Sequence, residues 1–175
     1  MKLKLIFSIS LILIISLFAK AQPRANPKKI KTNGSYVHGA TRTTFPDVLF
    51  GYMQKSVYSF DKKDLDVGVT YEKQYGNKCT TISIYIYPAN DGTENRLRNE
   101  YLNALQAIAN HSKNGLDATQ FPVKFTGEKY SCNGFKAQTN LSENDLSQLT
   151  VYECGTWFLK VRITSGLLDT TGMSG

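Results

Sequence analysis

The chain has 175 residues, of which 41% are hydrophobic and 20% charged, an ordinary composition for a single globular domain with a hydrophobic core. Its formal net charge of +7 is concentrated before residue 43, where eight of the 21 basic residues and none of the 14 acidic ones lie. The remaining 13 basic and 14 acidic residues leave the rest of the chain at −1. This balance argues against a nucleic-acid-binding domain, which would carry a basic patch on its fold.

Residues 1–21 have the pattern of a secretory signal peptide. Two lysines precede an apolar run from Leu5 to Phe18, and the sequence AKA at 19–21 fits a small-x-small cleavage site. The alternative is an uncleaved membrane anchor, but the run is shorter than the ~20 residues that span a bilayer. No cysteine lies near the cut, so we do not expect a lipoprotein. We expect an exported protein, periplasmic or secreted, that begins at Gln22 and has no transmembrane segment.

Residues 22–44 are rich in Pro, Gly, Asn, Thr and Lys and show no periodicity. Such a composition predicts a flexible polar linker. Five basic residues in this linker could touch an anionic surface, although a solvated tether is the simpler interpretation. A single α+β domain is then expected over residues 45–175.

Alternation of apolar and polar residues predicts three strands in the first half of this domain, at 56–60, 65–72 and 80–88. In the third, isoleucines at positions 82, 84 and 86 alternate with Ser83, Tyr85 and Tyr87. Because both faces of this strand are largely apolar, we expect a central strand that is covered on both sides. Pro88 ends it.

One helix is predicted after the third strand. Asp91 or Thr93 can cap its first turn, and Asn114-Gly115 supplies its end. Apolar residues recur at three- and four-residue spacing and form a stripe that should face the core. The stripe consists of Leu97, Tyr101, Ala104, Leu105 and Ile108.

The last part of the chain predicts a meander of four antiparallel strands. The sequence Asn133-Gly134 is a strong hairpin signal, and residues 142–145 and 155–156 supply two further turns. The strands would then span 121–132, 135–141, 147–154 and 157–164. The element order of strands, helix and strands indicates an α+β fold, an antiparallel sheet of about six to seven strands with one long helix packed on a face.

The final strand shows the clearest alternation in the chain. Trp157, Leu159, Val161 and Ile163 occupy one face, which we expect to pack against the helix, and Lys160 would point to the other.

Aromatic and cationic residues on the strand faces are the candidate ligand-binding side chains. Rings and cations together can hold a sugar, a peptide or an anionic lipid headgroup. The alternative is that the rings simply belong in strands and the cations lie over them. The candidates are Tyr85, Tyr87, Phe158, Lys160 and Arg162.

The three cysteines, Cys79, Cys132 and Cys154, cannot all pair within one chain. With a turn at 133–134, one strand would separate Cys132 from Cys154. Two strand spacings are about 9.6 Å, beyond the ~7 Å that a disulfide allows between Cα atoms, so the meander predicts that these two cannot bridge. Cys79 could reach either one, depending on strand order, and the pairing stays unknown.

The sequence contains no recognisable catalytic or metal-binding constellation. There is no CxxC, HxxxH, GxSxG, HExxH or glycine-rich phosphate loop, so neither a metal nor a cofactor is expected. His38 lies in the predicted linker, and His111 at the helix end suits the negative end of the helix dipole. The acidic residues at 61, 64 and 66 are expected to be solvated.

The order of these elements resembles the α/β/α sandwich of the PsbP-like family. The similarity covers residues 45–165 and rests on YSFDKKDLDVGVTYE, TTISIYIYPA, a helix and the closing hairpin TVYECGTWFLKVRIT. The strand WFLKVRIT is also similar to the end of small uncharacterised exported bacterial proteins. The PsbP-like resemblance implies a non-catalytic accessory or binding domain, and a terminal helix on the second sheet face.

The chain ends before such a terminal helix. We hypothesise that the natural protein continues past Gly175, with the helix starting near Thr170 or Thr171. A native protein whose intact mass ends at Gly175 would contradict this.

The function predicted from the sequence is a non-enzymatic exported domain that binds a partner protein or a small ligand in the cell envelope. One alternative is a thiol-dependent hydrolase that uses Cys154 or Cys132 with His111 as the base. A second alternative is a structural protein of the cell envelope that touches membrane or wall through its basic linker.

Overall fold

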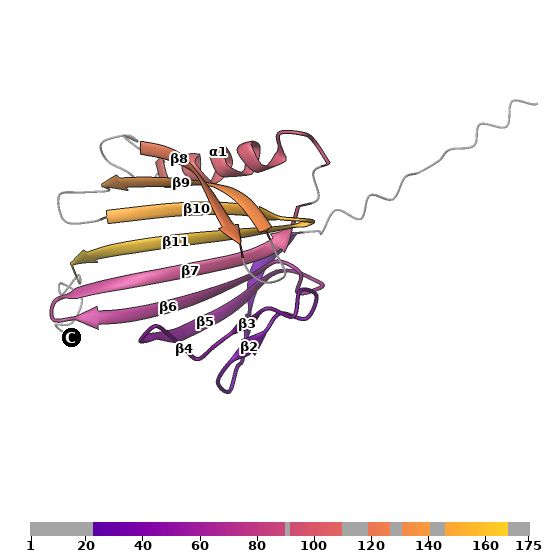
Figure 1. The fold of residues 1–175 in the computed structure, drawn as a ribbon. Coiled ribbons are helices and arrows are strands. Elements are labelled where there is room, and N and C mark those ends of the chain that lie inside the picture. The colour runs from indigo at the N-terminus through magenta and orange to yellow at the C-terminus, as the bar shows by residue number, and fades with distance from the viewer. Residues whose placement is uncertain (1–22, 90–91, 110–118, 127–130, 141–145, 168–175) are drawn as a thin grey trace, which may run out of the picture.

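A computed structural model describes residues 23–89, 92–109, 119–126, 131–140 and 146–167. In this part of the chain the protein is an antiparallel sheet with one helix, which confirms the predicted α+β class (Figure 1). The helix α1 spans Arg96–Ala109. The strands are β1 Pro23–Ile30, β2 Tyr36–Val37, β3 Thr44–Phe45, β4 Val48–Leu49, β5 Tyr52–Asp61, β6 Val67–Tyr75, β7 Lys78–Pro88, β8 Thr119–Thr126, β9 Ser131–Asn140, β10 Leu146–Cys154 and β11 Trp157–Leu167.

The main sheet has nine strands in the order β1-β5-β6-β7-β11-β10-β9-β8, with β4 paired to β5. The strands β2 and β3 form a separate two-stranded sheet. The meander of four strands after the helix is confirmed, since β8 to β11 pair in chain order. The main sheet is larger than the six to seven strands predicted, because β1 and β4 come from segments in which no strand was expected.

The predicted hairpin turn at Asn133-Gly134 is wrong, because both residues lie inside β9. There Gly134 pairs with Val123 of β8 and with Tyr152 of β10. A Cβ at Gly134 would lie 2.5 Å from the carbonyl oxygen of Val151 and 2.7 Å from the ring of Tyr152. The glycine therefore serves the close approach of a neighbouring side chain and backbone rather than a turn.

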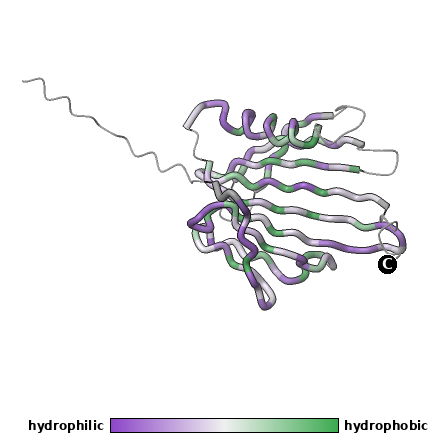
Figure 2. Tube along the Cα trace, turned by 180° about the vertical axis from the view of Figure 1, so that it is seen from behind, coloured by the Kyte–Doolittle hydropathy of each residue, from purple (hydrophilic) through white to green (hydrophobic). Residues whose placement is uncertain are grey.

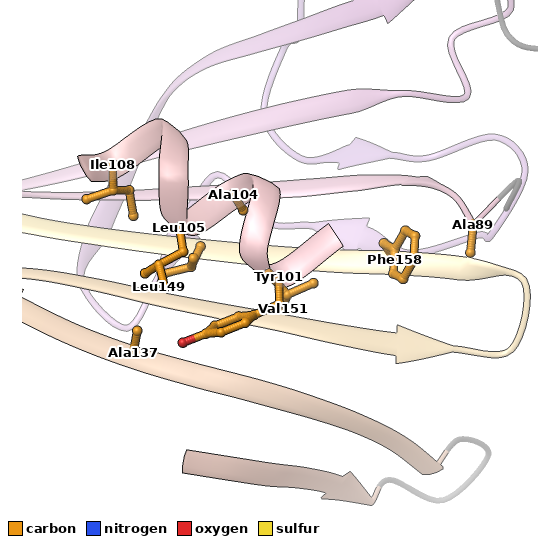
Figure 3. Packing of buried hydrophobic residues seen from close by; sticks show 9 residues of the cluster. All are labelled: Ala89, Tyr101, Ala104, Leu105, Ile108, Ala137, Leu149, Val151 and Phe158. Carbon is orange, nitrogen blue, oxygen red and sulfur yellow. The ribbon is translucent and has the colours of Figure 1, made fainter. Parts of the chain in front are cut away.

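The helix α1 packs on the half of the sheet that contains β9, β10 and β11 (Figure 1). The predicted apolar stripe faces this sheet, which confirms the helical spacing, whereas the predicted end at residues 114–115 lies outside the described residues. Figure 3 shows the resulting core, whose members come from the helix, from these strands and from Ala89, the residue after β7. They are Ala89, Tyr101, Ala104, Leu105, Ile108, Ala137, Leu149, Val151 and Phe158.

The two faces of β11 are reversed relative to the prediction. Phe158 belongs to the helix-side core, whereas Trp157 packs in a second cluster. Lys160 lies on the same face as Phe158 because side chains two residues apart in a strand share a face. Strict alternation identified the strand and its two sets of residues, but it does not say which set meets the helix.

A second core fills the opposite face of the sheet, over β5, β6 and β7. The N-terminal segment covers this face, and the Tyr71 hydroxyl donates a 2.9 Å hydrogen bond to the Pro46 carbonyl. Figure 2 shows hydrophobic residues recurring between hydrophilic ones along the long strands, the pattern of strands that bury one face in a core. The buried members are Phe45, Val57, Val67, Val69, Tyr71 and Ile86.

Residues 22–44 therefore do not form the predicted flexible linker where the structure describes them. The strand β1 extends the sheet by pairing with β5, and His38 is fully buried with an exposed fraction of 0%. The ring of His38 meets that of Trp157 edge-on, with centroids 5.3 Å apart. The polar composition of this segment hides its role, because its order comes from sheet pairing and from a few buried rings.

Candidate functional site

All five predicted ligand-binding residues lie on one face of the sheet, the face that carries α1. The register of β7 and β11 places Lys160 opposite Tyr85 and Phe158 opposite Tyr87. Directly paired residues of antiparallel strands point to the same side, and Arg162 follows two residues after Lys160. The structure thus brings the set together at the centre of the sheet.

The Lys160 ammonium lies over two tyrosine rings. Its Nζ is 5.0 Å from the ring centroid of Tyr85 and 5.1 Å from that of Tyr87. The helix supplies a counter-ion, since a carboxylate oxygen of Glu100 is 3.9 Å from the same nitrogen. The Tyr87 hydroxyl donates a 2.6 Å hydrogen bond to Glu100. Burial raises the pKa of Tyr87, and the Glu100 carboxylate raises it further, so the phenol stays protonated and remains a donor.

Phe158 does not contribute to an accessible surface. Its side chain is only 4% exposed and packs in the helix-side core, 5.7 Å from the Tyr87 ring centroid. A ring that the prediction did not include takes its place, because Phe60 of β5 lies 6.0 Å from Tyr85. Phe60, Tyr85 and Tyr87 form what we call the aromatic floor.

Gly68 allows the aromatic floor to extend across β6. It pairs with Tyr85, and a Cβ at Gly68 would lie 2.8 Å from that ring and 3.0 Å from the ring of Phe60. A larger residue would push both rings out of position. A glycine inside an alternating strand is the one sequence signal that could have revealed this close approach.

Asp66 adds a second carboxylate to the charged residues around Lys160, although the sequence predicted a solvated surface residue. Burial raises its pKa to about 6, Lys160 opposes this shift, and the charges of Asp61 and Glu100 add to it. Asp61 is itself 2% exposed, where a solvated residue was expected, and its carboxylate accepts hydrogen bonds from the amides of Leu65 and Asp66.

The Asp66→Asn variant is expected to be more stable than the wild type at pH 8 and equally stable near pH 4. The folded-state pKa of Asp66, about 6, lies above the ordinary value of 3.8, so ionisation is disfavoured in the folded state. Its cost is fully present above pH 6 and disappears as the pH falls from 6 towards 3.8. Urea unfolding at both pH values measures the difference. A stabilisation of equal size at both would contradict a raised pKa.

Arg162 contributes a buried side-chain hydrogen-bond donor to the site. Its Nε is buried, and within the described part of the chain it has no hydrogen-bond partner. A buried donor without an acceptor costs about 1–3 kcal/mol, and a guanidinium is well shaped to meet a carboxylate or a phosphate. The site therefore combines an aromatic floor, a paired cation and a second cation with an unused donor.

His38 lies apart from this site, on the opposite face of the sheet. Its Nδ1 is 2.8 Å from the Thr41 hydroxyl, and burial lowers the pKa of the imidazole. Packed against Trp157, this histidine holds the N-terminal segment in place.

Cys132 and Cys154 form a disulfide, contrary to the prediction that they cannot bridge. Because β9 runs straight through Asn133 and Gly134, the two cysteines are directly opposite on adjacent strands, with Cα atoms 4.6 Å apart. Neither sulfur is then a thiolate, so the alternative of a hydrolase that uses either cysteine loses its nucleophile. Cys79 is a free thiol of intermediate exposure, and His111 lies outside the described residues.

Within the described residues, no group of three or more histidine, cysteine, aspartate or glutamate side chains could hold a metal ion. No helix in the same ranges is both long and apolar enough to cross a bilayer.

The fold and site define an α+β domain with a candidate binding face. Comparison with protein-family models, with curated proteins and with solved structures finds no match.

Proposed function

We propose that this protein is an exported, non-enzymatic domain of the cell envelope that binds a small acidic ligand on the helix-bearing face. The observation that carries the proposal is that Lys160 lies over the tyrosines of the aromatic floor while Arg162, two residues along the same face of β11, has a buried Nε without an acceptor among the described residues. A flat or ring-shaped ligand can stack on the tyrosines. The acidic group of the ligand would accept hydrogen bonds from the Arg162 guanidinium.

Three other features support the proposal. A disulfide between Cys132 and Cys154 suits the oxidising compartment to which a signal peptide would direct the chain. The resemblance to PsbP-like domains, made from the order of elements, agrees with a binding role. Glu100 holds Lys160 as its partner of opposite sign, and within the described part of the chain neither residue belongs to a nucleophile–base pair.

The double variant Lys160→Ala/Arg162→Ala is expected to lose ligand binding. Glucuronate, glycerol phosphate, a nucleoside monophosphate and an acidic peptide would each be compared in thermal-shift assays with a neutral counterpart. We expect an acidic member of one pair to raise the melting temperature, because its acidic group pairs with the cations, and the double variant to abolish that rise.

Lys124→Ala/Lys136→Ala is the matched control, since it removes the same charge from strands β8 and β9. If the ligand raises the melting temperature of both double variants by the same amount, Lys160 and Arg162 do not form the site. If none of these compounds shifts the wild type, the small-ligand proposal is wrong and a partner protein becomes the occupant to test.

A further inference from the structure

The turn between β4 and β5 has a sequence that does not suit its backbone. Phe50 and Gly51 form a two-residue hairpin loop, with φ angles of 50° and 80°. Loops with positive φ at both residues favour Asn-Gly or Asp-Gly, because glycine and asparagine adopt left-handed conformations readily. A bulky aromatic residue at positive φ is an outlier that carries backbone strain.

Packing does not compensate for this strain, because the Phe50 side chain is 92% exposed. It is the most exposed of the large hydrophobic residues in the described part of the chain. The residue therefore neither suits its turn nor buries its ring within the monomer. Strain that the surrounding structure tolerates without gaining stability indicates a functional surface.

A lysine that contacts two tyrosine rings lies beside this turn. The Lys73 Nζ is 3.0 Å from the position that a Cβ on Gly51 would take, so the ammonium lies against the turn itself. The same nitrogen is 5.6 Å from the ring centroid of Tyr52 and 4.8 Å from that of Tyr75. No carboxylate within the described residues forms an ion pair with it.

The neighbouring elements add further apolar surface at this end of the sheet. The pairing of Met53 with Glu72 places the β4–β5 turn next to the β6–β7 turn, and both lie at the left end of these strands in Figure 1. Of the side chains in these hairpins, Val48 is 42%, Tyr75 51% and Met53 52% exposed.

We propose that the Phe50 tip, defined as Phe50, Gly51, Tyr52, Lys73 and Tyr75, docks on the surface of an anionic phospholipid bilayer. Phe50 enters the boundary between headgroups and acyl chains. The tyrosines lie at the headgroup level, which aromatic residues with a polar end favour at membrane interfaces. The Lys73 ammonium meets lipid phosphates, and anionic lipids attract it further.

A bilayer fits this tip better than a folded protein partner does. A stable protein interface buries at least about 1,000 Å² in total, and its core holds several anchors in pockets. A single protruding ring on a two-residue turn presents little such area. Shallow insertion into a bilayer requires only a few apolar side chains next to a cation. This surface is separate from the aromatic floor, so the two proposals can fail independently.

The test measures co-sedimentation with phosphatidylcholine vesicles that contain or lack phosphatidylglycerol. All variants are purified as the same expression host processes them, so they share one N-terminus. The wild type is expected to bind the anionic vesicles, and Phe50→Asn to bind about tenfold more weakly because a buried aromatic ring is lost. Asparagine suits the turn, so Phe50→Asn should melt at the same or a higher temperature.

Two further variants distinguish insertion of Phe50 from nonspecific adsorption of the protein to vesicles. Phe125→Thr removes another exposed phenylalanine, on the edge strand β8, and is expected to bind like the wild type. Phe50→Trp is expected to lose tryptophan fluorescence on vesicles that contain brominated lipids, because the ring enters the bilayer. The proposal is wrong if the wild type ignores anionic vesicles, if Phe50→Asn binds undiminished, or if Phe125→Thr loses as much binding as Phe50→Asn does. Unchanged fluorescence of Phe50→Trp on bound vesicles would also overturn it.

Discussion

Replacing both cysteines in Cys132→Ala/Cys154→Ala is expected to lower the free energy of unfolding by about 3 kcal/mol. The bond closes a loop of 22 residues and joins β9 to β10 within the helix-bearing half of the sheet. Its loss returns conformational freedom to the unfolded chain and leaves two small side chains in place of the bridge. Urea unfolding of the variant and of the oxidised wild type measures this difference directly.

Cys79→Ala is the matched control for the disulfide. Cys79 has no sulfur partner, and its side chain is only partly buried, so the change should cost less than about 1 kcal/mol. Iodoacetamide applied to the native, unreduced protein should modify no cysteine other than Cys79. Labelling of Cys132 or Cys154, or a double variant as stable as Cys79→Ala, would show that the bond is absent in solution.

Tyr71→Ala is expected to destabilise the protein by about 4 kcal/mol, as truncations of large buried aromatic residues do. Tyr71 is 0% exposed and packs in the core beneath the N-terminal segment, where its hydroxyl reaches Pro46. The variant leaves a cavity and an unpaired carbonyl between β6 and this segment. Chemical denaturation gives the magnitude, and limited proteolysis of residues 23–45 reports whether the segment has come away from the sheet.

Two companion variants divide this effect into its parts. Tyr71→Phe keeps the ring and removes only the hydrogen bond, so a loss of about 1 kcal/mol is expected. Leu102→Ala removes an apolar side chain that is 43% exposed on the helix and should change stability little. If Tyr71→Ala costs no more than Leu102→Ala, the N-terminal segment does not pack on the sheet as the structure places it.

Most strands and the helix could be predicted from sequence because their signals are local. The period-two pattern of β11 and the three- and four-residue spacing of the α1 stripe both reflect which side chains share a face of one element. The strand β1 was missed because its polar, lysine-bearing sequence is typical of both a linker and an exposed edge strand. Only pairing with β5 distinguishes the two possibilities.

The candidate site could be predicted in part. Tyr85, Tyr87, Lys160 and Arg162 share a face, as alternation requires, and the register of β7 and β11 places them side by side. Their partners Glu100 and Asp66 could not be found, because a charged residue on a helix and another after a turn look like ordinary solvated residues. Their role depends on packing between elements far apart in the chain.

The prediction that Cys132 and Cys154 cannot bridge depended on one local signal. Asn133-Gly134 has the composition of a hairpin turn, and a turn there would put an extra strand between two cysteines that in fact lie on adjacent strands. In the folded protein Gly134 is needed for the approach of Val151 and Tyr152, a reason that exists only once β10 is beside β9.

By itself, the sequence determined the α+β class, the four-strand meander, the apolar stripe of α1 and the set of rings and cations that share a face. These properties follow from short-range periodicity, which each element carries within its own residues. The tertiary structure alone decided which face of β11 the helix covers, that the N-terminal segment completes the second core, and that Cys132 meets Cys154. Those outcomes depend on strand order and register, because contacts between distant segments are selected by the packing of the whole sheet.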